Sequence, residues 1–300
     1  MEWKPIETAP KDEMLHMTLM GGQARVLLCR TTMLSYEAAK IHQPSDTACA
    51  ALSRLMSGTL MLGVMMKGAN DSVTVTVAGD GPMGKMTAVA RGGSVKVTAE
   101  YPQADVEKRA DGHLNVGALF GHKGRMTVIK DLGLKEPYIG QVNLVSGELG
   151  EDFAQYFTAS EQTPSLVALG ARVNDGVPLS TGGLLIQALP GCEESTLEQL
   201  EVRSMLFADI SRELAENDLE ELAKAWFDGL DLSVIAKQPL FYRCDCSREK
   251  MARALVTLGE SELTDMIETD HHATLTCHFC RTSQEFSEDD LRKLLASAKN

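Results

Sequence analysis

Four cysteines near the C-terminal end of the chain have the spacing of a metal site. One residue separates Cys244 from Cys246, and after thirty more residues come Cys277 and Cys280, two residues apart. Zinc prefers four tetrahedral ligands and binds thiolates strongly, and each short spacing lets two sulfurs face one ion. Four thiols leave no open position for water. We therefore predict one Zn²⁺ per chain in a closed site with a structural or switching role.

Basic residues and histidines lie close to these cysteines in the sequence. A nearby cation lowers the pKa of a thiol and favours the thiolate, which is the form that oxidants attack. The opposing interpretation, that these are solvated surface charges, carries equal weight. The histidines are alternative ligands, but with four thiols present we expect them to stay outside the ligand set. The basic residues are Arg243, Arg248, Lys250 and Arg281, and the histidines are His271, His272 and His278.

Other chemically suggestive features have simpler structural interpretations. Cys29 and Cys49 lie in apolar runs and are expected to be buried, whereas Cys192 has no partner at a ligand spacing. The string GDGPMG at Gly79–Gly84 matches a dinucleotide-binding pattern, but no helix pattern follows it, so we predict a hairpin turn. None of the seven histidines is followed two positions later by Glu, as a zinc deaminase would require. We therefore expect that the chain is not an enzyme.

Composition and charge restrict the partners of the chain. Apolar residues make up 44% of the 300 positions, enough for a buried core, and the formal net charge is -13. Nucleic acids and anionic membranes attract clustered Lys and Arg, so we expect neither as a partner. The first residues lack the apolar segment of a secretory signal. We therefore expect a reducing cytoplasm, where cysteines serve as ligands or reactive thiols more often than in structural disulfides.

The first part of the chain, residues 1–191, combines strand and helix patterns. The most apolar window, Thr47–Met66, contains Arg54 and small polar residues, which favours a buried helix, capped by Ser45 or Asp46 and extending to about Lys67, over a membrane span. This predicts an α+β fold class with an N-terminal mixed sheet-and-helix core. Another helix is expected at Glu151–Ser160, and strands are expected at Ala24–Thr31, Ser72–Ala78, Met83–Ala90, Ser94–Ala99, Arg125–Lys130, Tyr138–Ser146, Leu166–Val173 and Gly183–Leu189.

Residues 192–237 have a different pattern, in which apolar residues recur at helical spacing between acidic ones. Residues 192–236 contain 12 acidic and 3 basic side chains, which supplies -9 of the net charge of -13. We predict a helical linker at 192–237, with a second helix capped by Asn217 or Asp218, and a small zinc-binding domain at 238–300 with a helix over Ser247–Leu258. The linker side chains expected to cover the core are Leu206, Ile210, Leu214, Leu222, Trp226 and Phe227.

From about Gly22 to Leu295 the chain resembles the heat-shock protein 33 family, the redox-regulated bacterial holdase chaperones. Residues before about Asp12 lie outside this resemblance. The motifs that carry it are Arg30-Thr31-Thr32, Leu60-Met61-Leu62-Gly63, Lys67-Gly68, Gly79-Asp80-Gly81-Pro82-Met83-Gly84, Lys130-Asp131-Leu132-Gly133-Leu134, Ser146-Gly147-Glu148-Leu149-Gly150, Ser160-Glu161-Gln162-Thr163-Pro164-Ser165, Gly182-Gly183, Ile186-Gln187, Pro190-Gly191, Cys244-x-Cys246-Ser247-Arg248-Glu249 and Cys277-His278-Phe279-Cys280.

The resemblance implies an ATP-independent stress-response chaperone that is inactive while reduced and zinc-bound. Oxidation to two disulfides would release the zinc, unfold the C-terminal part and expose an apolar surface that holds unfolding client proteins, with dimerisation of the oxidised form. The short spacing within each motif leads us to expect the disulfides Cys244–Cys246 and Cys277–Cys280. The alternative is a zinc-ribbon module that binds nucleic acid; the cations near the cysteines favour it slightly, and the overall charge opposes it.

Overall fold

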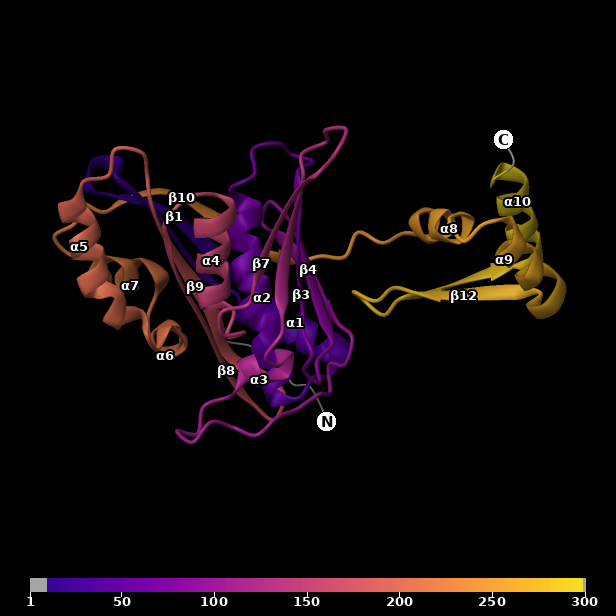
Figure 1. The fold of residues 1–300 in the computed structure, drawn as a ribbon, viewed down its shortest axis with the longest axis horizontal. Helices are drawn as coiled ribbons and strands as arrows, with labels where there is room; N and C mark the ends of the chain where they lie inside the picture. Colours follow the sequence, from indigo (N-terminus) through magenta and orange to yellow (C-terminus); the bar gives the residue numbers. More distant parts are fainter. Residues whose placement is uncertain (1–9, 299–300) are drawn as a thin grey trace. The chain divides into compact units, whose positions relative to one another are not determined.

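The computed structural model describes residues 10–298, so the expectations about the first nine residues lie outside the described part of the chain. Backbone contacts divide the chain between Tyr242 and Arg243 into two compact units, and each is described by itself. The structure contains both helices and antiparallel sheets, as the α+β class requires (Figure 1). The expected boundary at 191–192 falls inside the first unit, and the division into a core, a helical linker and a zinc-binding domain stays a prediction.

The first unit contains two sheets. All their pairings are antiparallel except that of β11 with β5, which is parallel. The five-stranded sheet has the order β10 (Ser233–Pro239), β1 (Glu13–Leu19), β2 (Ala24–Arg30), β9 (Val177–Ala188), β8 (Ser165–Asn174). The six-stranded sheet has the order β11 (Phe241–Tyr242), β5 (Ser94–Ala99), β4 (Lys85–Arg91), β3 (Ser72–Ala78), β6 (Arg125–Asp131), β7 (Tyr138–Asn143).

Helix α2 (Asp46–Val64) lies between the two sheets and is the centre of the core. The Ser45 side chain accepts a hydrogen bond from the backbone N–H of Ala48, as a helix N-cap does. The helix is long and apolar enough to cross a membrane, but 89% of its apolar window is buried inside the protein, so its composition reflects a central position in the core. Three other helices complete this layer: α1 (Thr32–His42), α3 (Val116–Phe120) and α4 (Gly150–Ser160).

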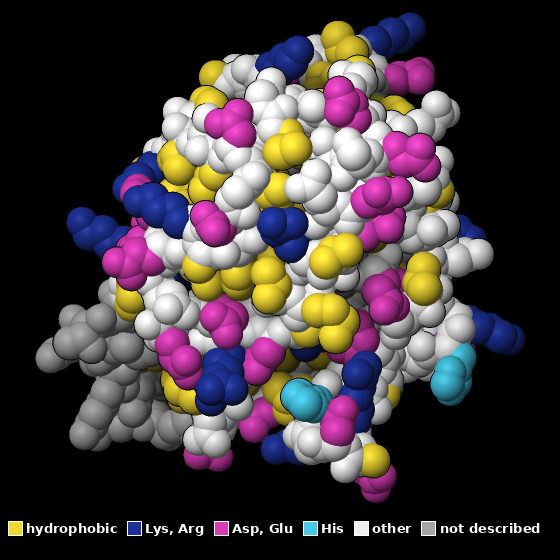
Figure 2. All heavy atoms as spheres, turned by 90° about the vertical axis from the view of Figure 1, so that its left-hand side faces the viewer, with side chains coloured by type: hydrophobic (Ala, Val, Ile, Leu, Met, Phe, Trp, Pro, Cys, Tyr) yellow, Lys and Arg dark blue, Asp and Glu magenta, His cyan; other side chains and the backbone are white. Residues whose placement is uncertain are grey.

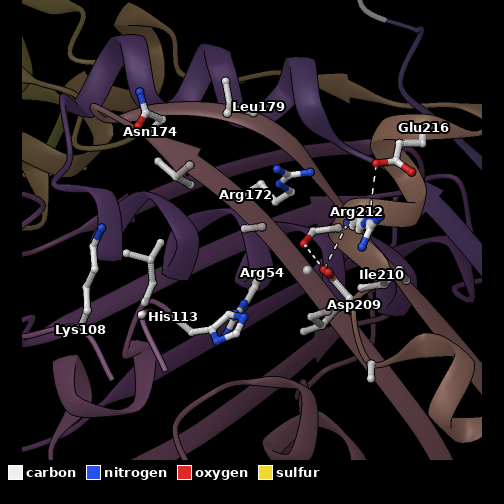
Figure 3. Close-up of a pocket in the computed structure, with 18 residues that line it drawn as sticks. Arg54, Lys108, His113, Arg172, Asn174, Leu179, Asp209, Ile210, Arg212 and Glu216 are labelled. Atoms are coloured by element: carbon white, nitrogen blue, oxygen red, sulfur yellow. Dashed lines mark hydrogen bonds and ion pairs between the residues drawn. The ribbon is translucent and has the colours of Figure 1, made fainter. Parts of the chain in front are cut away.

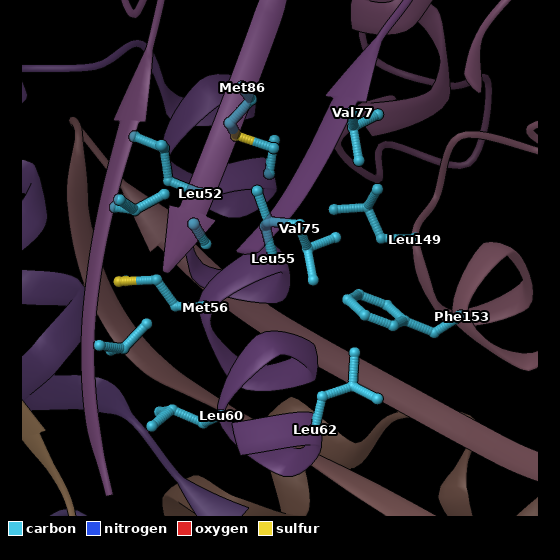
Figure 4. Close-up of a cluster of buried hydrophobic side chains, with 14 of the residues drawn as sticks. Leu52, Leu55, Met56, Leu60, Leu62, Val75, Val77, Met86, Leu149 and Phe153 are labelled. Carbon is cyan, nitrogen blue, oxygen red and sulfur yellow. The ribbon is translucent and has the colours of Figure 1, made fainter. Parts of the chain in front are cut away.

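The core around α2 is built from side chains that alternate along the strands. Figure 4 shows Leu52, Leu55 and Met56 of α2 facing strand residues such as Val75 and Val77. The glycine-rich string Gly79–Gly84 forms the turn between β3 and β4, as predicted. A Cβ at Gly79 would lie 2.0 Å from the carbonyl oxygen of Phe120, so the close approach of α3 requires glycine there.

The five-stranded sheet is buried on both faces, because a second set of helices covers the face opposite α2. Along β2, Leu27 and Cys29 pack in the cluster around α2, whereas Val26 and Leu28 pack under the second set. Figure 2 shows the outer surface on this side of the molecule, with acidic side chains between apolar ones. The covering elements are α5 (Glu194–Arg203), the 3₁₀ helix η2 (Ser204–Phe207), α6 (Ile210–Glu216) and α7 (Leu219–Trp226).

The second unit is small. Its hairpin of β12 (His272–Thr276) and β13 (Ser283–Ser287) packs with α8 (Arg248–Val256), α9 (Glu260–Asp265), the π-helical turn η3 (Met266–Asp270) and α10 (Glu288–Ala298). Ser247 caps α8 by accepting a hydrogen bond from Lys250 N. The buried apolar residues of its core are few, and they are Met251, Leu255, Leu263, Ile267, Phe286 and Leu291.

The end of the predicted helical linker is a strand. Residues 233–237 belong to β10, which pairs with β1 and covers what would be an edge of the five-stranded sheet. The side chains of β10 are mostly exposed, so this strand has no apolar alternation that would reveal it in the sequence. The chain therefore leaves the sheet at β9, forms the covering helices, and returns to the same sheet at β10.

Candidate functional site

The structure brings the four predicted metal-binding cysteines together. Cys244 and Cys246 precede α8, and Cys277 and Cys280 lie in the loop of the β12–β13 hairpin. That loop is a tight turn, in which Cys277 N donates to Thr282 O and Arg281 N donates to Cys277 O. The four sulfurs all lie within 4.8 Å of one another, and all four side chains are half-buried.

The distances between sulfurs fit a tetrahedral zinc ion. Ligands ~2.3 Å from a tetrahedral centre lie roughly 3.8 Å apart. The separation between the Sγ atoms of Cys244 and Cys277 is 3.7 Å, and that between Cys246 and Cys280 is 3.3 Å. These two short separations run across the motifs, whereas the disulfides expected from the sequence lie within them. The pairing concerns the oxidised chain and stays a prediction.

The thiols ionise unequally in this cluster. Burial raises the pKa of Cys244 to about 11, and burial followed by the neighbouring sulfurs raises the pKa of Cys246. Burial also acts to raise the pKa of Cys280, but hydrogen bonds with Thr282, 3.3 Å away, and with the other thiols outweigh it and lower that pKa to about 6. Four thiolates therefore need a cation beside them, and a Zn²⁺ held by these four cysteines would supply that charge and keep the sulfurs deprotonated.

Two of the basic residues near the cysteines are paired with carboxylates. Arg248 lies 2.8 Å from Asp290 and stacks over the ring of Phe286, and Lys250 pairs with Asp245. These carboxylates partly neutralise the two cations, so Arg248 and Lys250 stabilise a thiolate, or attract a phosphate, less strongly than unpaired cations would. This removes part of the support for the nucleic-acid alternative, which depended on these cations.

The histidines lie outside the sulfur cluster, as predicted. His271 pairs with Glu288 at 3.2 Å, and His272 Nδ1 lies 2.8 Å from the carbonyl oxygen of Asp270. Among residues 10–298 the group of potential ligand atoms at this site contains the four cysteines and no histidine. The three remaining cysteines are elsewhere, and burial raises the pKa of both Cys29 and Cys49 to about 12, which makes these two unreactive.

Five of the six linker side chains predicted to cover the core are buried. Ile210, Leu214, Leu222, Trp226 and Phe227 pack on the outer face of the five-stranded sheet together with residues of β1, β2 and β9. The predicted set left out five further linker members of this cluster, and these are Leu200, Phe207, Leu219, Ala223 and Leu230.

The prediction for Leu206 is wrong, because this side chain is 48% exposed while its neighbour Phe207 is 2% exposed. Phe207 makes an edge-on contact with Trp226, with 5.0 Å between ring centroids, and lies 5.9 Å from the ring of Phe227. Leu206 and Phe207 end the 3₁₀ helix η2, and the non-helical backbone of Asp209 (φ -117, ψ 51) separates them from α6. The four-residue spacing of Leu206, Ile210 and Leu214 therefore does not place Leu206 on the buried face of α6.

A buried arginine fastens the covering helices to the sheet. Arg30 on β2 is 3% exposed, and its Nη2 donates to the carbonyl oxygens of Leu214 at 3.0 Å and Asn217 at 2.6 Å. These carbonyls lie at the C-terminal end of α6, where a cation is favoured by the helix dipole. Arg30 is part of the motif Arg30-Thr31-Thr32, but its contact with a segment 184 residues away has no local sequence signal.

The similarity to known proteins extends over nearly the whole chain. The model of a family described as "Hsp33 protein" matches residues 12–287. A "33 kDa chaperonin" of Clostridium perfringens is 40% identical over 288 residues, which cover 95% of this chain and 91% of that protein. One of Clostridioides difficile is 38% identical over 287 residues, covering 95% and 99%. The crystal structure of the 33 kDa chaperonin (heat shock protein 33 homolog) from Thermotoga maritima superposes with a TM-score of 0.88 at 28% identity, covering 96% and 99%.

Proposed function

The chain belongs to the heat-shock protein 33 family of chaperones, and from this premise we propose that it is an ATP-independent holdase controlled by oxidation of its four-cysteine cluster. In this proposal the reduced, zinc-bound form is inactive. Two equivalents of a two-electron oxidant, such as a peroxide that is reduced to water, accept four electrons from the four thiolates and leave two disulfides. The disulfide sulfurs no longer bind zinc, so the ion is released. The active form, a homodimer in the cytoplasm, holds unfolding client proteins.

The observation that carries the proposal is the four-thiol cluster in a unit with little core of its own. Six buried apolar side chains are a small core, and Cys246 and Cys277 themselves pack against it. Structural zinc contributes roughly 10–16 kcal/mol of apparent binding free energy, and units of this size often need such a contribution. Loss of the sulfur ligands is therefore expected to unfold residues 243–300.

The covering helices supply a candidate surface for clients. If α5–α7 leave the five-stranded sheet, apolar residues of β1, β2 and β9 such as Leu15, Val26 and Ile186 lose their cover. Each fully buried aliphatic side chain contributes roughly 1.5–3 kcal/mol when it is removed from water, which is the driving force for binding an unfolding chain instead. The acidic outer surface of the same helices favours solubility of the segment when it is released.

The test compares reduced, zinc-loaded protein with oxidised protein in suppressing the aggregation of a heat-unfolded reporter protein without ATP. We expect suppression by the oxidised sample only, together with release of one zinc per chain. Cys192→Ser is the matched control, because Cys192 lies outside the cluster, and it should switch like the unmodified protein. An oxidised sample that suppresses aggregation no better than the reduced one would refute the proposed function.

A further inference from the structure

A pocket lined by basic residues opens between α2, β8 and α6. It has a volume of about 1110 Å³, slightly above the roughly 300–1,000 Å³ of small-molecule sites, and none of its lining residues belongs to the four-cysteine cluster. Figure 3 shows side chains from separate elements around this space: Arg54 from α2, Arg172 from β8 and Arg212 from α6. Lys108 and His113, from the segment before α3, line it as well. This concentration of cations contrasts with the net charge of -13 of the chain.

The positive charge in and beside the pocket is incompletely neutralised. Within residues 10–298, neither Lys108 nor Arg172 pairs with a carboxylate. Arg54 lies 2.5 Å from Glu148, but this one carboxylate also serves Arg109 at 2.5 Å. The buried Nε of Arg54 has no hydrogen-bond partner among the described atoms.

Two carboxylates on α6 and its N-cap oppose this charge. Glu216 lies 3.4 Å from Arg212, and Asp209 accepts hydrogen bonds from Arg212 N and Ser211 Oγ. His113 lies 3.0 Å from Asp111 and is not counted here. The four Lys and Arg side chains that line the pocket therefore face three carboxylates, Glu148 included, and the excess is one positive charge. Guanidinium groups bind phosphate oxygens with two parallel hydrogen bonds, which suits a ligand that carries several phosphate groups.

The pocket exists only while α6 is packed on β8. The strand has glycine at position 170, where a Cβ would lie 2.6 Å from Ile210 Cγ2 and 2.7 Å from Ser211 N, so the helix packs directly on the strand backbone. Arg172 follows on the same strand, and Arg212 follows on the helix. A ligand held between these two side chains contacts both elements at once.

We propose that this pocket binds a compact polyanion of two or three linked phosphate groups, and that the bound anion holds α6 against β8. Because the ligand binds only the docked arrangement, opening of α6 falls about 100-fold when the ligand is present at 100 times its Kd. The consequence for client binding, a higher threshold for activation, rests on the proposed function. The binding site itself does not.

The experiment is calorimetric titration of the reduced full chain with inorganic triphosphate, with sulfate at matched ionic strength as the reference anion. We expect saturable binding of triphosphate, and Kd values at least about tenfold higher for Arg172→Gln and Arg212→Gln, since a charge-assisted hydrogen bond is lost. Both side chains are exposed, so the variants should keep the fold, which thermal melting checks. Arg91→Gln on β4 is the control, an exposed arginine that does not line the pocket, and its Kd should be unchanged.

Hydrogen exchange of residues 210–216 then tests whether the bound anion holds α6 against β8. Triphosphate should slow this exchange in the unmodified chain and leave it unchanged in Arg172→Gln. Absence of saturable binding, or equal Kd values for Arg172→Gln and Arg91→Gln, would overturn the proposed binding site. Binding without slower exchange would overturn the proposal that the anion holds α6 against β8. A nucleoside triphosphate arm shows whether the phosphate groups are taken free or on a nucleotide. None of these readouts uses a client protein, so a failure of the proposed function is distinguishable from a failure of this site.

Discussion

Leu206 and Phe207 are adjacent and both apolar, but only Phe207 is buried. Comparing an alanine substitution at each position therefore tests whether burial of the covering helices, and not merely their apolar composition, holds them on the sheet. Phe207→Ala removes a ring that is 2% exposed and that contacts Trp226 and Phe227, which costs about 3–5 kcal/mol in a packed cluster. If this burial holds α5–α7 on the sheet, the equilibrium for their release rises about 100- to 4000-fold. Leu206→Ala removes a side chain that is 48% exposed and costs about 1 kcal/mol, or roughly a fivefold change.

Two assays on reduced, zinc-loaded protein measure this difference. Limited trypsin digestion reports release, because Arg203, Arg212 and Lys224 lie within the covering helices. Aggregation of a heat-unfolded reporter protein reports activity. We expect Phe207→Ala to be cut faster and to hold clients without oxidation, while Leu206→Ala behaves nearly as the unmodified chain. If Phe207→Ala is cut faster but stays inactive, release of these helices is not the gate and the proposed mechanism is wrong. If the two variants are cut equally fast, the burial argument itself fails.

The same reasoning gives three further predictions. Metal analysis of the reduced chain should find one zinc, and Cys280→Ser should weaken zinc binding strongly; an unchanged affinity would contradict the four-sulfur site. Peptide mapping after oxidation should find mainly Cys244–Cys246 and Cys277–Cys280, and a majority of cross-motif bridges, such as Cys246 to Cys277, would count against the pairing. Arg30→Ala loses two hydrogen bonds to α6 carbonyls and should speed trypsin cleavage of the linker by the equivalent of about 1.5–3 kcal/mol, with Arg30→Lys in between; equal rates for all three proteins would show that this contact does not fasten the helix.

The sequence was sufficient where the determining interactions are local. The clustering of the four cysteines could be predicted because each pair is set by a short spacing, and the two pairs meet after a segment that begins with α8. Ser247 was predicted as a helix start, and Ser45 and Asp218 were each one of two predicted caps; the structure has all three, since each cap is a hydrogen bond over two or three residues. Predictions of strands such as Ser72–Ala78 were correct because one face of the strand is buried, so apolar and polar residues alternate along its sequence.

The tertiary structure decided whatever depends on partners distant in the sequence. The apolar residues of the linker allowed either Leu206 or Phe207 to face the core, and only packing against the sheet buries Phe207 and leaves Leu206 exposed. The strand β10 has no apolar alternation and exists because β1 offers it backbone hydrogen bonds. The contact of Arg30 with α6 and the grouping of Arg54, Arg172 and Arg212 in one pocket likewise have no local signature, because a charge in a sequence does not say which other charges folding will place beside it.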